Sequence, residues 1–424
     1  MPDPRPRSPE RAVRHIRHDV HDRPFIVIWE VTRACQLACR HCRADAIHHR
    51  NPGELTTQQG FALLDDIAAW GKPAPIVILT GGDPFERPDL ADLTRHGHEA
   101  GLHMALSPSA TPTVTPQRLA QLRDAGASAV SLSLDGATAA THDAFRRVER
   151  TFDRTIESAR LVTDAGFRLQ VNSTVTRRTV TELPAMLGLL LDLHVHLWSL
   201  FFLVPTGRGQ SLEALTPEEV EDTLHWLADV SDVIATKTTE AQHFRRVVLQ
   251  RARAHEAGEP MAPRGELYAR LTDATTAVLA GREVSKRPAR PPIDTNSGRG
   301  FMFIDHLGQV YPSGFLPFPA GSVTEVDVKT IYRDAPVMRA LRRPDEFVGK
   351  CGACEFNDVC GGSRSHAYAV TGDPLASDPT CLFVPPGWVD DGARPVPGRA
   401  FAPLTTGLPL APAPPAEQMR AHEH

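Results

Sequence analysis

Three cysteines near the start of the chain, Cys35, Cys39 and Cys42, have the spacing C-x3-C-x2-C. Three thiolates on one short loop can hold three irons of a cubane cluster, and they leave the fourth iron without a protein ligand. A catalytic centre needs such an open metal position, whereas a cluster that only carries electrons normally takes four cysteines. A structural zinc loop is the alternative interpretation, with His41 or His48 as the fourth ligand.

The remaining four cysteines form a second group at Cys351, Cys354, Cys360 and Cys381. Seven cysteines are an odd number, so they cannot all be paired as disulfides, and clustered cysteines in an intracellular chain more often bind metal. The groups of three and four account for all seven cysteines. This division indicates one metal site with an open coordination position and one whose metal positions are all bound by cysteine. Four thiolates suit zinc as well as an iron–sulfur cluster, so this group alone does not decide its metal.

The composition argues against several classes of partner. The chain has 424 residues, a net charge of −5 and no basic run that would bind nucleic acid. Its longest apolar runs are too short to span a bilayer, so we expect no membrane partner. Residues 1–24 are rich in Arg, Asp, Pro and His and lack the apolar core of a secretory signal. We interpret them as a solvated N-terminal extension of a cytoplasmic protein.

Strand and helix patterns alternate over residues 25–205. Apolar, β-branched runs predict strands at Phe25–Val31, Pro75–Thr80, Leu102–Ser107, Ala129–Leu134, Arg168–Val175 and Leu197–Val204. Amphipathic segments predict helices at Thr56–Trp70, Asp89–Ala100, Pro116–Ala125, Phe152–Ala165 and Val180–Leu193. Such βα units imply parallel strands, which make either a doubly wound sheet or an incomplete βα barrel.

Polar residues and glycines gather where these predicted strands end. They are Gly81, Gly82 and Asp83 after the second strand, Ser133 in the fourth, Asn172 on the fifth and Arg208 after the sixth. Parallel α/β folds build their active sites at the carboxyl ends of the strands. An ordinary turn would explain any one of these residues. Several of them, however, lie at the same ends of the predicted strands as the cysteine loop, and together they indicate a site at this edge of the sheet.

The second half of the chain has a different pattern. Residues 206–299 predict a helical connector without a strand, with helices from the Thr216 capping box to about Asp232, at Thr239–Ala257 and at Gly265–Ala280. Residues 300–385 predict a small cysteine-rich domain, with a β-hairpin at Phe301–Ile304 and Gln309–Tyr311 and a helix at Lys329–Leu341. Residues 386–424 are rich in Pro and Ala and predict a disordered tail.

The first cysteine motif, directly after a strand, resembles the cluster motif of the radical S-adenosylmethionine (SAM) enzymes. The resemblance implies a partial (βα)6 TIM-like barrel over residues 25–205 rather than a doubly wound sheet. It also implies that Cys35, Cys39 and Cys42 hold a [4Fe–4S] cluster with an open iron site, which the amino and carboxylate groups of SAM chelate. One electron then cleaves SAM, and the 5′-deoxyadenosyl radical abstracts a substrate hydrogen.

The same resemblance implies a set of SAM contacts. Gly81-Gly82-Asp83-Pro84 is similar to the Gly-Gly-Glu motif that receives the SAM ammonium group. Asp83 is one methylene shorter than glutamate, so the resemblance implies that backbone carbonyls make more of the contacts to the ammonium group. His142-Asp143-Ala-Phe-Arg146 resembles a segment whose arginine pairs with the SAM carboxylate, the alternative being a surface arginine. Ser133 and Asn172 are ribose or carboxylate contacts or else ordinary strand residues, and His41 stands where the family has an aromatic residue near the adenine.

The second cysteine group resembles the SPASM/Twitch extension, which holds auxiliary [4Fe–4S] clusters. Ser313 and Arg364 occupy positions where a full SPASM domain would have further cysteines, so the resemblance implies one auxiliary cluster with an electron-relay or structural role. The pattern Cys-Gly-x-Cys, then Cys-Gly-Gly-Ser-Arg, is most similar to the haem d1 and alternative-haem biosynthesis group. Those enzymes alter propionate side chains of a tetrapyrrole.

These resemblances predict a radical SAM enzyme that acts on a tetrapyrrole side chain and takes electrons from a donor such as flavodoxin or ferredoxin. A maturase of a ribosomally made peptide is the rival, although the chain lacks room before Phe25 for the usual peptide-binding domain. A non-catalytic, zinc-stabilised binding module is a more remote alternative. The sequence identifies no general acid or base. Residues expected near the cavity are Asp294, Asp305, His306, Tyr311 and Tyr368.

Overall fold

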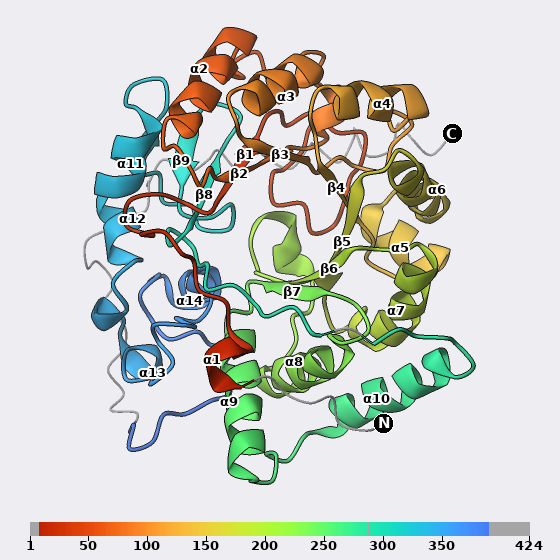
Figure 1. Cartoon of the computed structure of the whole chain (residues 1–424), viewed down its shortest axis with the longest axis vertical. Helices are drawn as coiled ribbons and strands as arrows, with labels where there is room; N and C mark the ends of the chain where they lie inside the picture. The colour runs from red at the N-terminus through yellow and green to blue at the C-terminus, as the bar shows by residue number, and fades with distance from the viewer. Residues whose placement is uncertain (1–7, 287, 390–424) are drawn as a thin grey trace.

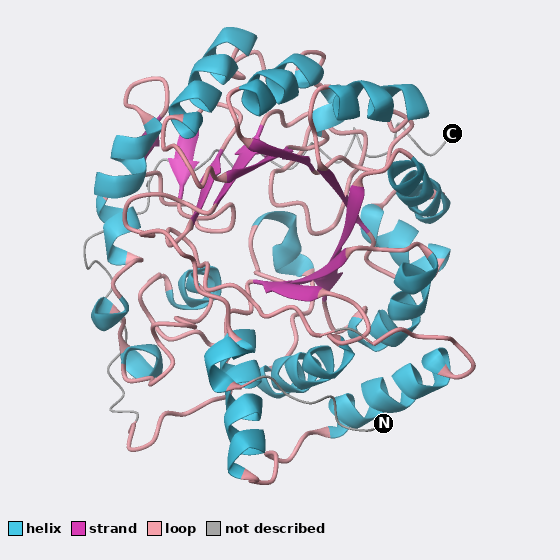
Figure 2. Ribbon diagram, in the orientation of Figure 1, coloured by secondary structure: helices cyan, strands magenta, loops and turns pink. Residues whose placement is uncertain are grey.

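One curved sheet organises the part of the chain that the computed structural model describes, residues 8–286 and 288–389. Its strands run in the order β10-β9-β8-β1-β2-β3-β4-β5-β6-β7. From β8 through β1 to β7 each neighbouring pair is parallel, and β9 and β10 add antiparallel strands at one edge. The sheet bends into an incomplete ring with helices around its outside (Figures 1 and 2).

The first six strands confirm the predicted barrel. All strands of the described residues are β1 Ile26–Glu30, β2 Ile76–Thr80, β3 His103–Leu106, β4 Ala129–Ser133, β5 Arg168–Val175, β6 Leu197–Phe202, β7 Thr236–Thr239, β8 Phe301–Ile304, β9 Gln309–Tyr311 and β10 Gly321–Ser322. From β1 to β6 the spatial order equals the chain order, whereas a doubly wound sheet reverses direction partway.

The helices between these strands form the outer layer. They are α2 Thr57–Ala68, α3 Leu90–Glu99, α4 Pro116–Asp124, α5 Ala139–Arg146, α6 Thr151–Asp164 and α7 Leu183–Asp192. Thr56 begins α2 with a capping box, and Thr115 caps α4 ahead of Pro116. Outward strand residues such as Trp29 pack on these helices, and a Cβ added to Gly60 of α2 would lie 2.8 Å from the Trp29 ring. The sequence did not predict α5.

The connector contains β7, so the prediction of a stretch without strands is wrong there. The sequence Thr-Lys-Thr-Thr carries no apolar run, and β7 is extended because it pairs with the edge of β6. The helix expected from Thr239 therefore begins later, as α9 Phe244–Ala257. α8 Pro217–Val230 and α10 Glu266–Leu279 lie close to their predicted positions.

The cysteine-rich segment joins the barrel sheet directly. β8 and β9 form the predicted hairpin, and β8 also pairs in parallel with β1. The single helix expected over Lys329–Leu341 is split into α11 Val328–Asp334 and α12 Pro336–Ala340, since Pro336 forces the preceding Ala335 into an extended conformation. The remaining elements are α1 Pro9–Ala12, α13 Gly349–Gly352, α14 Arg364–Thr371 and the 3-10 turns η1 Pro84–Glu86, η2 Val180–Glu182, η3 Gly207–Ser211 and η4 Pro344–Glu346.

Residues 8–24 pack against the fold, which corrects the expectation of a solvated extension. Ala12 and Val13 are buried, and the Tyr332 hydroxyl donates to the Val20 carbonyl at 2.7 Å. The few apolar residues among the charged ones supply these contacts. Most of the predicted disordered tail, residues 390–424, lies outside the described residues.

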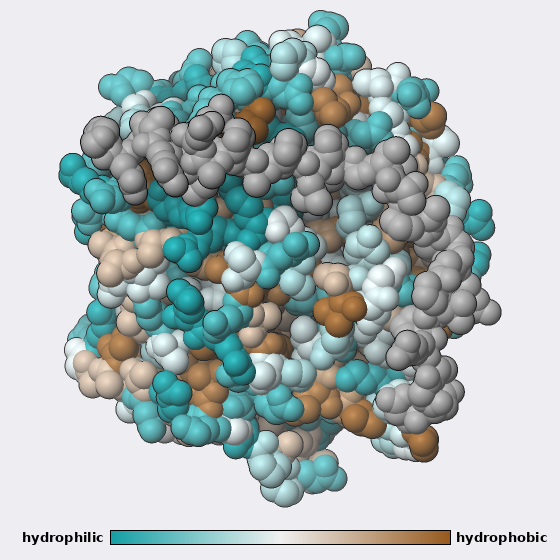
Figure 3. Space-filling view, turned by 180° about the vertical axis from the view of Figure 1, so that it is seen from behind, coloured by the Kyte–Doolittle hydropathy of each residue, from teal (hydrophilic) through white to brown (hydrophobic). Residues whose placement is uncertain are grey.

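The face opposite to that of Figure 1 carries polar and apolar residues in small mixed groups (Figure 3). Over residues 8–286 and 288–389, no helix has both the length and the apolar character needed to cross a membrane.

Candidate active site and auxiliary metal centre

The loop after β1 brings Cys35, Cys39 and Cys42 to one shielded place. Cys35 and Cys39 are buried with Leu37 in a small apolar cluster, and Cys42 packs against it. Hydrogen-bond donors lie against all three sulfurs, and such donors favour the thiolate form. The donors are Leu37 N at 3.3 Å from Cys35 Sγ, Ala46 N at 3.5 Å from Cys42 Sγ and Arg146 Nη1 at 3.4 Å from Cys39 Sγ.

Burial raises the pKa of the Cys35 thiol to about 11, so metal binding at this loop must release a proton. Among the described residues, no three His, Cys, Asp or Glu side chains converge on a point that one metal ion could occupy. A cubane cluster places its thiolates on separate irons, so its ligands do not need to converge in this way.

The two glycines after β2 allow a close approach to the cysteine loop. A Cβ on Gly81 would lie 2.4 Å from the Thr32 carbonyl oxygen, and one on Gly82 would lie 2.4 Å from the Ala34 carbonyl oxygen. Gly82 N donates to Thr32 O at 2.8 Å, and Asp83 N donates to Ala34 O at 2.6 Å. Glycine permits such a close approach because it has no Cβ, and here the approach is made to the chain itself.

The Asp83 carboxylate is fully buried and bound by the chain. It accepts hydrogen bonds from Phe85 N at 3.0 Å, Ser109 N at 3.3 Å and the Thr111 hydroxyl at 2.9 Å. Burial raises the pKa of this carboxyl to about 6. The side chain ties the β2 loop to the segment after β3, and most of its acceptor positions are occupied.

Arg146 is a buried residue, so the surface alternative is wrong. Its Nη2 forms an ion pair with Asp135 just after β4, and its Nη1 donates to Cys39 Sγ. Asp135 also accepts a hydrogen bond from Thr174 N at 2.7 Å. Burial opposes ionisation of Asp135, but the charge of Arg146, the two neighbouring histidines and the hydrogen bond from Thr174 N together outweigh it and lower the pKa of this carboxyl. Both terminal nitrogens of Arg146 thus already have hydrogen-bond partners within the chain.

His41 presents a flat face beside the cysteine loop. Its ring stacks on Phe145 with 4.6 Å between centroids, and burial lowers its pKa to about 4, so the imidazole is neutral. The Nδ1 atom is buried without a hydrogen-bond partner in the described structure.

Ser133 and Asn172 lie side by side on the inner face of the ring. Ser133 is in register with Asn172, which is in register with Ser199 of β6. Trp198 packs outward on Trp226 of α8, so the alternation of the strand places Ser199 inward. The Ser199 hydroxyl is buried without a partner among the residues described. The sequence analysis missed Ser199, although a single serine in an apolar strand is the signal that could have found it.

Of the residues expected near the cavity, His306 contacts the strand that leads into the cysteine loop. Its Nδ1 contacts Glu30 at 3.1 Å at the end of β1, and Glu30 also pairs with Arg43. Tyr311 donates to Asp305 at 3.4 Å in the hairpin. The two others make contacts elsewhere: Asp294 binds Ile16 N, and Tyr368 packs on Phe318.

All four cysteines of the second group line one recess. This recess is partly open to solvent, with Phe356 and Phe383 as apolar walls and Arg246 and Lys350 as cations. Donors again lie against the sulfurs, which suits a negatively charged thiolate cluster. The donors are Phe356 N to Cys354 at 3.5 Å, Gly362 N to Cys360 at 3.4 Å, Asp378 N to Cys351 at 3.3 Å, Arg364 Nη2 to Cys351 at 3.6 Å and Arg246 Nη2 to Cys381 at 3.9 Å.

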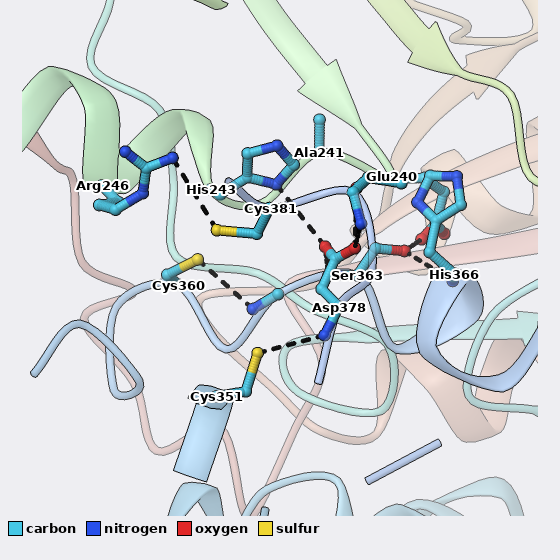
Figure 4. A network of polar contacts seen from close by, with 12 residues as sticks. Glu240, Ala241, His243, Arg246, Cys351, Cys360, Ser363, His366, Asp378 and Cys381 are labelled. Atoms are coloured by element: carbon cyan, nitrogen blue, oxygen red, sulfur yellow. Dashed lines mark hydrogen bonds and ion pairs between the residues drawn. The ribbon is translucent and has the colours of Figure 1, made fainter. Parts of the chain in front are cut away.

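A buried polar network connects this recess with the barrel (Figure 4). Asp378, next to Cys351, accepts from Ser363 N at 2.6 Å, and the Ser363 hydroxyl donates to Glu240 at 2.5 Å. Glu240 follows β7 and also accepts from Ser313 at 3.3 Å. Ser313 and Arg364, which stand where further cysteines would be expected, therefore bind the chain itself.

Comparison with known proteins identifies the family. Residues 29–189 match the family described as the Radical SAM superfamily. The chain is also 36% identical over 364 residues to the AdoMet-dependent heme synthase of Methanosarcina barkeri. The aligned region covers 85% of this chain and 97% of the relative. The chain belongs to the radical SAM superfamily.

Further relatives of this radical SAM enzyme extend the likeness. It is 30% identical over 372 residues to the pre-heme d1 synthase of Dinoroseobacter shibae, covering 84% of this chain and 86% of the relative. Streptococcus suis SuiB, solved bound to the precursor peptide SuiA, has a TM-score of 0.59 at 15% identity over 85% of this chain and 76% of that chain. At this identity the solved structure shows that the fold is shared.

The residues present fit the cofactors of a radical SAM enzyme, a [4Fe–4S] cluster and SAM. The cluster supplies the electron that cleaves SAM into a hydrogen-abstracting radical. Buried polar atoms without a partner are rare in native proteins, and several gather in the described residues around the cysteine loop. They are His41 Nδ1, Arg146 Nε, Thr206 Oγ1 and Arg208 Nε and Nη2. A ligand with amino, carboxylate, hydroxyl and purine groups, as SAM has, could satisfy them.

Gly82→Ala is expected to prevent assembly of the first radical SAM cluster. The added methyl group would meet the backbone oxygens of Arg33 and Ala34 at 2.5 and 2.4 Å, so the cysteine loop must shift. Reconstituted protein should lose about four of about eight irons and its SAM cleavage. Gly53→Ala is the matched control, since its Cβ meets a flexible Leu307 methyl at 3.2 Å. Full iron content and activity in Gly82→Ala would show that this close approach is not required.

Proposed function

We propose that this radical SAM enzyme takes part in heme formation by abstracting a hydrogen atom from a propionate side chain of a tetrapyrrole. The observation that carries the proposal is the 36% identity to a heme synthase, which the chain matches over 97% of the relative's length. The likeness to a pre-heme d1 synthase supports the same substrate class. A peptide substrate has less support, because the peptide-bound neighbour is only 15% identical.

In this proposal the chain positions SAM at the carboxyl edge of the sheet. Cys35, Cys39 and Cys42 hold the first cluster, and the four cysteines around the second recess hold one auxiliary cluster. Gly81 and Gly82 offer backbone carbonyls to the SAM ammonium group, because the Asp83 carboxylate is occupied by the chain. Ser133 and Asn172 contact the SAM ribose from the inner face.

The neutral His41 ring offers a flat surface to the adenine. Arg146 holds Cys39 and Asp135 in place, and only its Nε remains without a partner among the described residues. A flavodoxin or ferredoxin in the cytoplasm supplies the electrons.

Transfer of deuterium tests the substrate. Iron coproporphyrin III carries propionates, and we expect anaerobic protein with dithionite and SAM to move deuterium from their methylene groups into 5′-deoxyadenosine. The same tetrapyrrole labelled only at its methyl groups is the control and should transfer none. SAM cleavage without deuterium transfer from any position would contradict a tetrapyrrole substrate while leaving the radical SAM assignment intact.

A further inference from the structure

Two donor atoms of the Arg208 side chain have no partner. The residue is half-buried, and its Nε and Nη2 atoms are buried without a hydrogen-bond partner within the described residues. The arginines that are buried in the described chain all donate to a carboxylate or a backbone carbonyl. They are Arg87, Arg146, Arg245, Arg246, Arg342 and Arg364. Arg208 therefore differs from the arginines that stabilise the fold.

The backbone places Arg208 beside the first cysteine group. A Cβ on Gly207 would lie 3.0 Å from the Cys42 carbonyl oxygen, and one on Gly209 would lie 3.9 Å from the His41 Cα. The loop after β6 thus packs against the cysteine loop on both sides of Arg208. This contact places the backbone of Arg208 beside the loop that carries the first three cysteines.

The acid on the neighbouring loop is already occupied, because Asp135 is paired with Arg146. The buried Nε and Nη2 atoms of Arg208 therefore have no acceptor within the described residues. A buried donor that lacks an acceptor is destabilising, so a ligand that brings an acceptor for these two atoms would be favoured here.

We infer that Arg208 binds a carboxylate of a ligand in the active site. The planar guanidinium fork matches a carboxylate with two parallel hydrogen bonds. The carboxylate comes either from the methionine part of SAM or from a propionate of the tetrapyrrole, and the second source rests on the proposed function. The cluster itself is the competing counter-ion, since a thiolate-ligated cluster is negatively charged.

Binding to matched ligand pairs separates these sources. SAM is compared with decarboxylated SAM by anaerobic equilibrium dialysis, and iron coproporphyrin III is compared with its tetramethyl ester by absorbance titration. The full-length reconstituted proteins are wild type, Arg208→Gln, Arg208→Lys and Arg160→Gln, an exposed control on α6. Iron content and circular dichroism show which variants are folded.

Arg208→Gln should weaken binding of one carboxylate ligand by about 10- to 100-fold and leave its carboxylate-free analogue unchanged. Arg208→Lys should be intermediate, because it keeps the charge but loses the fork. Unchanged affinity for both carboxylate ligands would overturn the inference, as would an equal loss for the analogues or a change confined to the reduction potential of the cluster. If wild type binds no tetrapyrrole, the proposed function fails, and the SAM pair still decides the role of Arg208.

Discussion

Replacing Cys35, Cys39 and Cys42 together by alanine is expected to lower the iron content from about eight to about four atoms per chain and to abolish 5′-deoxyadenosine formation. The three sulfurs share one shielded loop, whereas the other four cysteines line a separate recess. The variant should therefore lose one cluster and keep the other. Iron and sulfide are counted after anaerobic reconstitution, and SAM cleavage is assayed with dithionite.

The complementary alanine variant of Cys351, Cys354 and Cys360 is the control. It should lose a similar amount of iron and keep the cluster at the first loop. Stoichiometric zinc in wild type, with no SAM cleavage, would contradict the two-cluster assignment.

Asp135→Asn is expected to lower the free energy of unfolding by about 3–5 kcal/mol, because it leaves the buried Arg146 without its counter-ion. It should also reduce SAM cleavage, since Arg146 holds Cys39 Sγ. Urea unfolding of the anaerobic apoprotein gives the stability difference. The double variant with Arg146→Gln should recover part of the loss, because it removes the uncompensated charge.

The matched control for Asp135 is an exposed ion pair. Asp92 pairs with Arg95 on α3, and their side chains are 60% and 45% exposed. Asp92→Asn should change stability by less than about 1 kcal/mol. If Asp135→Asn has an equally small effect, the buried pair is not a stabilising element of the site.

The barrel strands could be predicted because their signals are local. β1 to β6 have apolar or β-branched runs, and the helices between them have capping residues such as Thr56 and Thr115. β7 has no such run, and its extended conformation depends on the partner strand β6. A strand that exists through pairing alone leaves no periodic pattern in the sequence.

The sequence predicted the metal-binding cysteines of the site better than the contacts of its charged side chains. The spacing of the cysteines predicts two metal sites, and the structure places the cysteines of each group together. Whether Asp83 and Arg146 are free or occupied depends on groups distant in sequence, such as Thr111 and Asp135, and no local pattern encodes those contacts. The same holds for Arg208, whose lack of a partner becomes visible only in the folded chain.

The pairing of β8 with β1 has a consequence for the order of events during synthesis. Ile26 lies opposite Phe301, so the first strand lacks this partner until a segment 275 residues further along the chain has been made. Until then β1 keeps one edge unpaired, next to the loop that will hold an oxygen-sensitive cluster. Contacts this distant in sequence form slowly, because a long loop must close first. We therefore expect the edge of β1 beside the first cysteine loop to stay unprotected until residues 301–304 have been made.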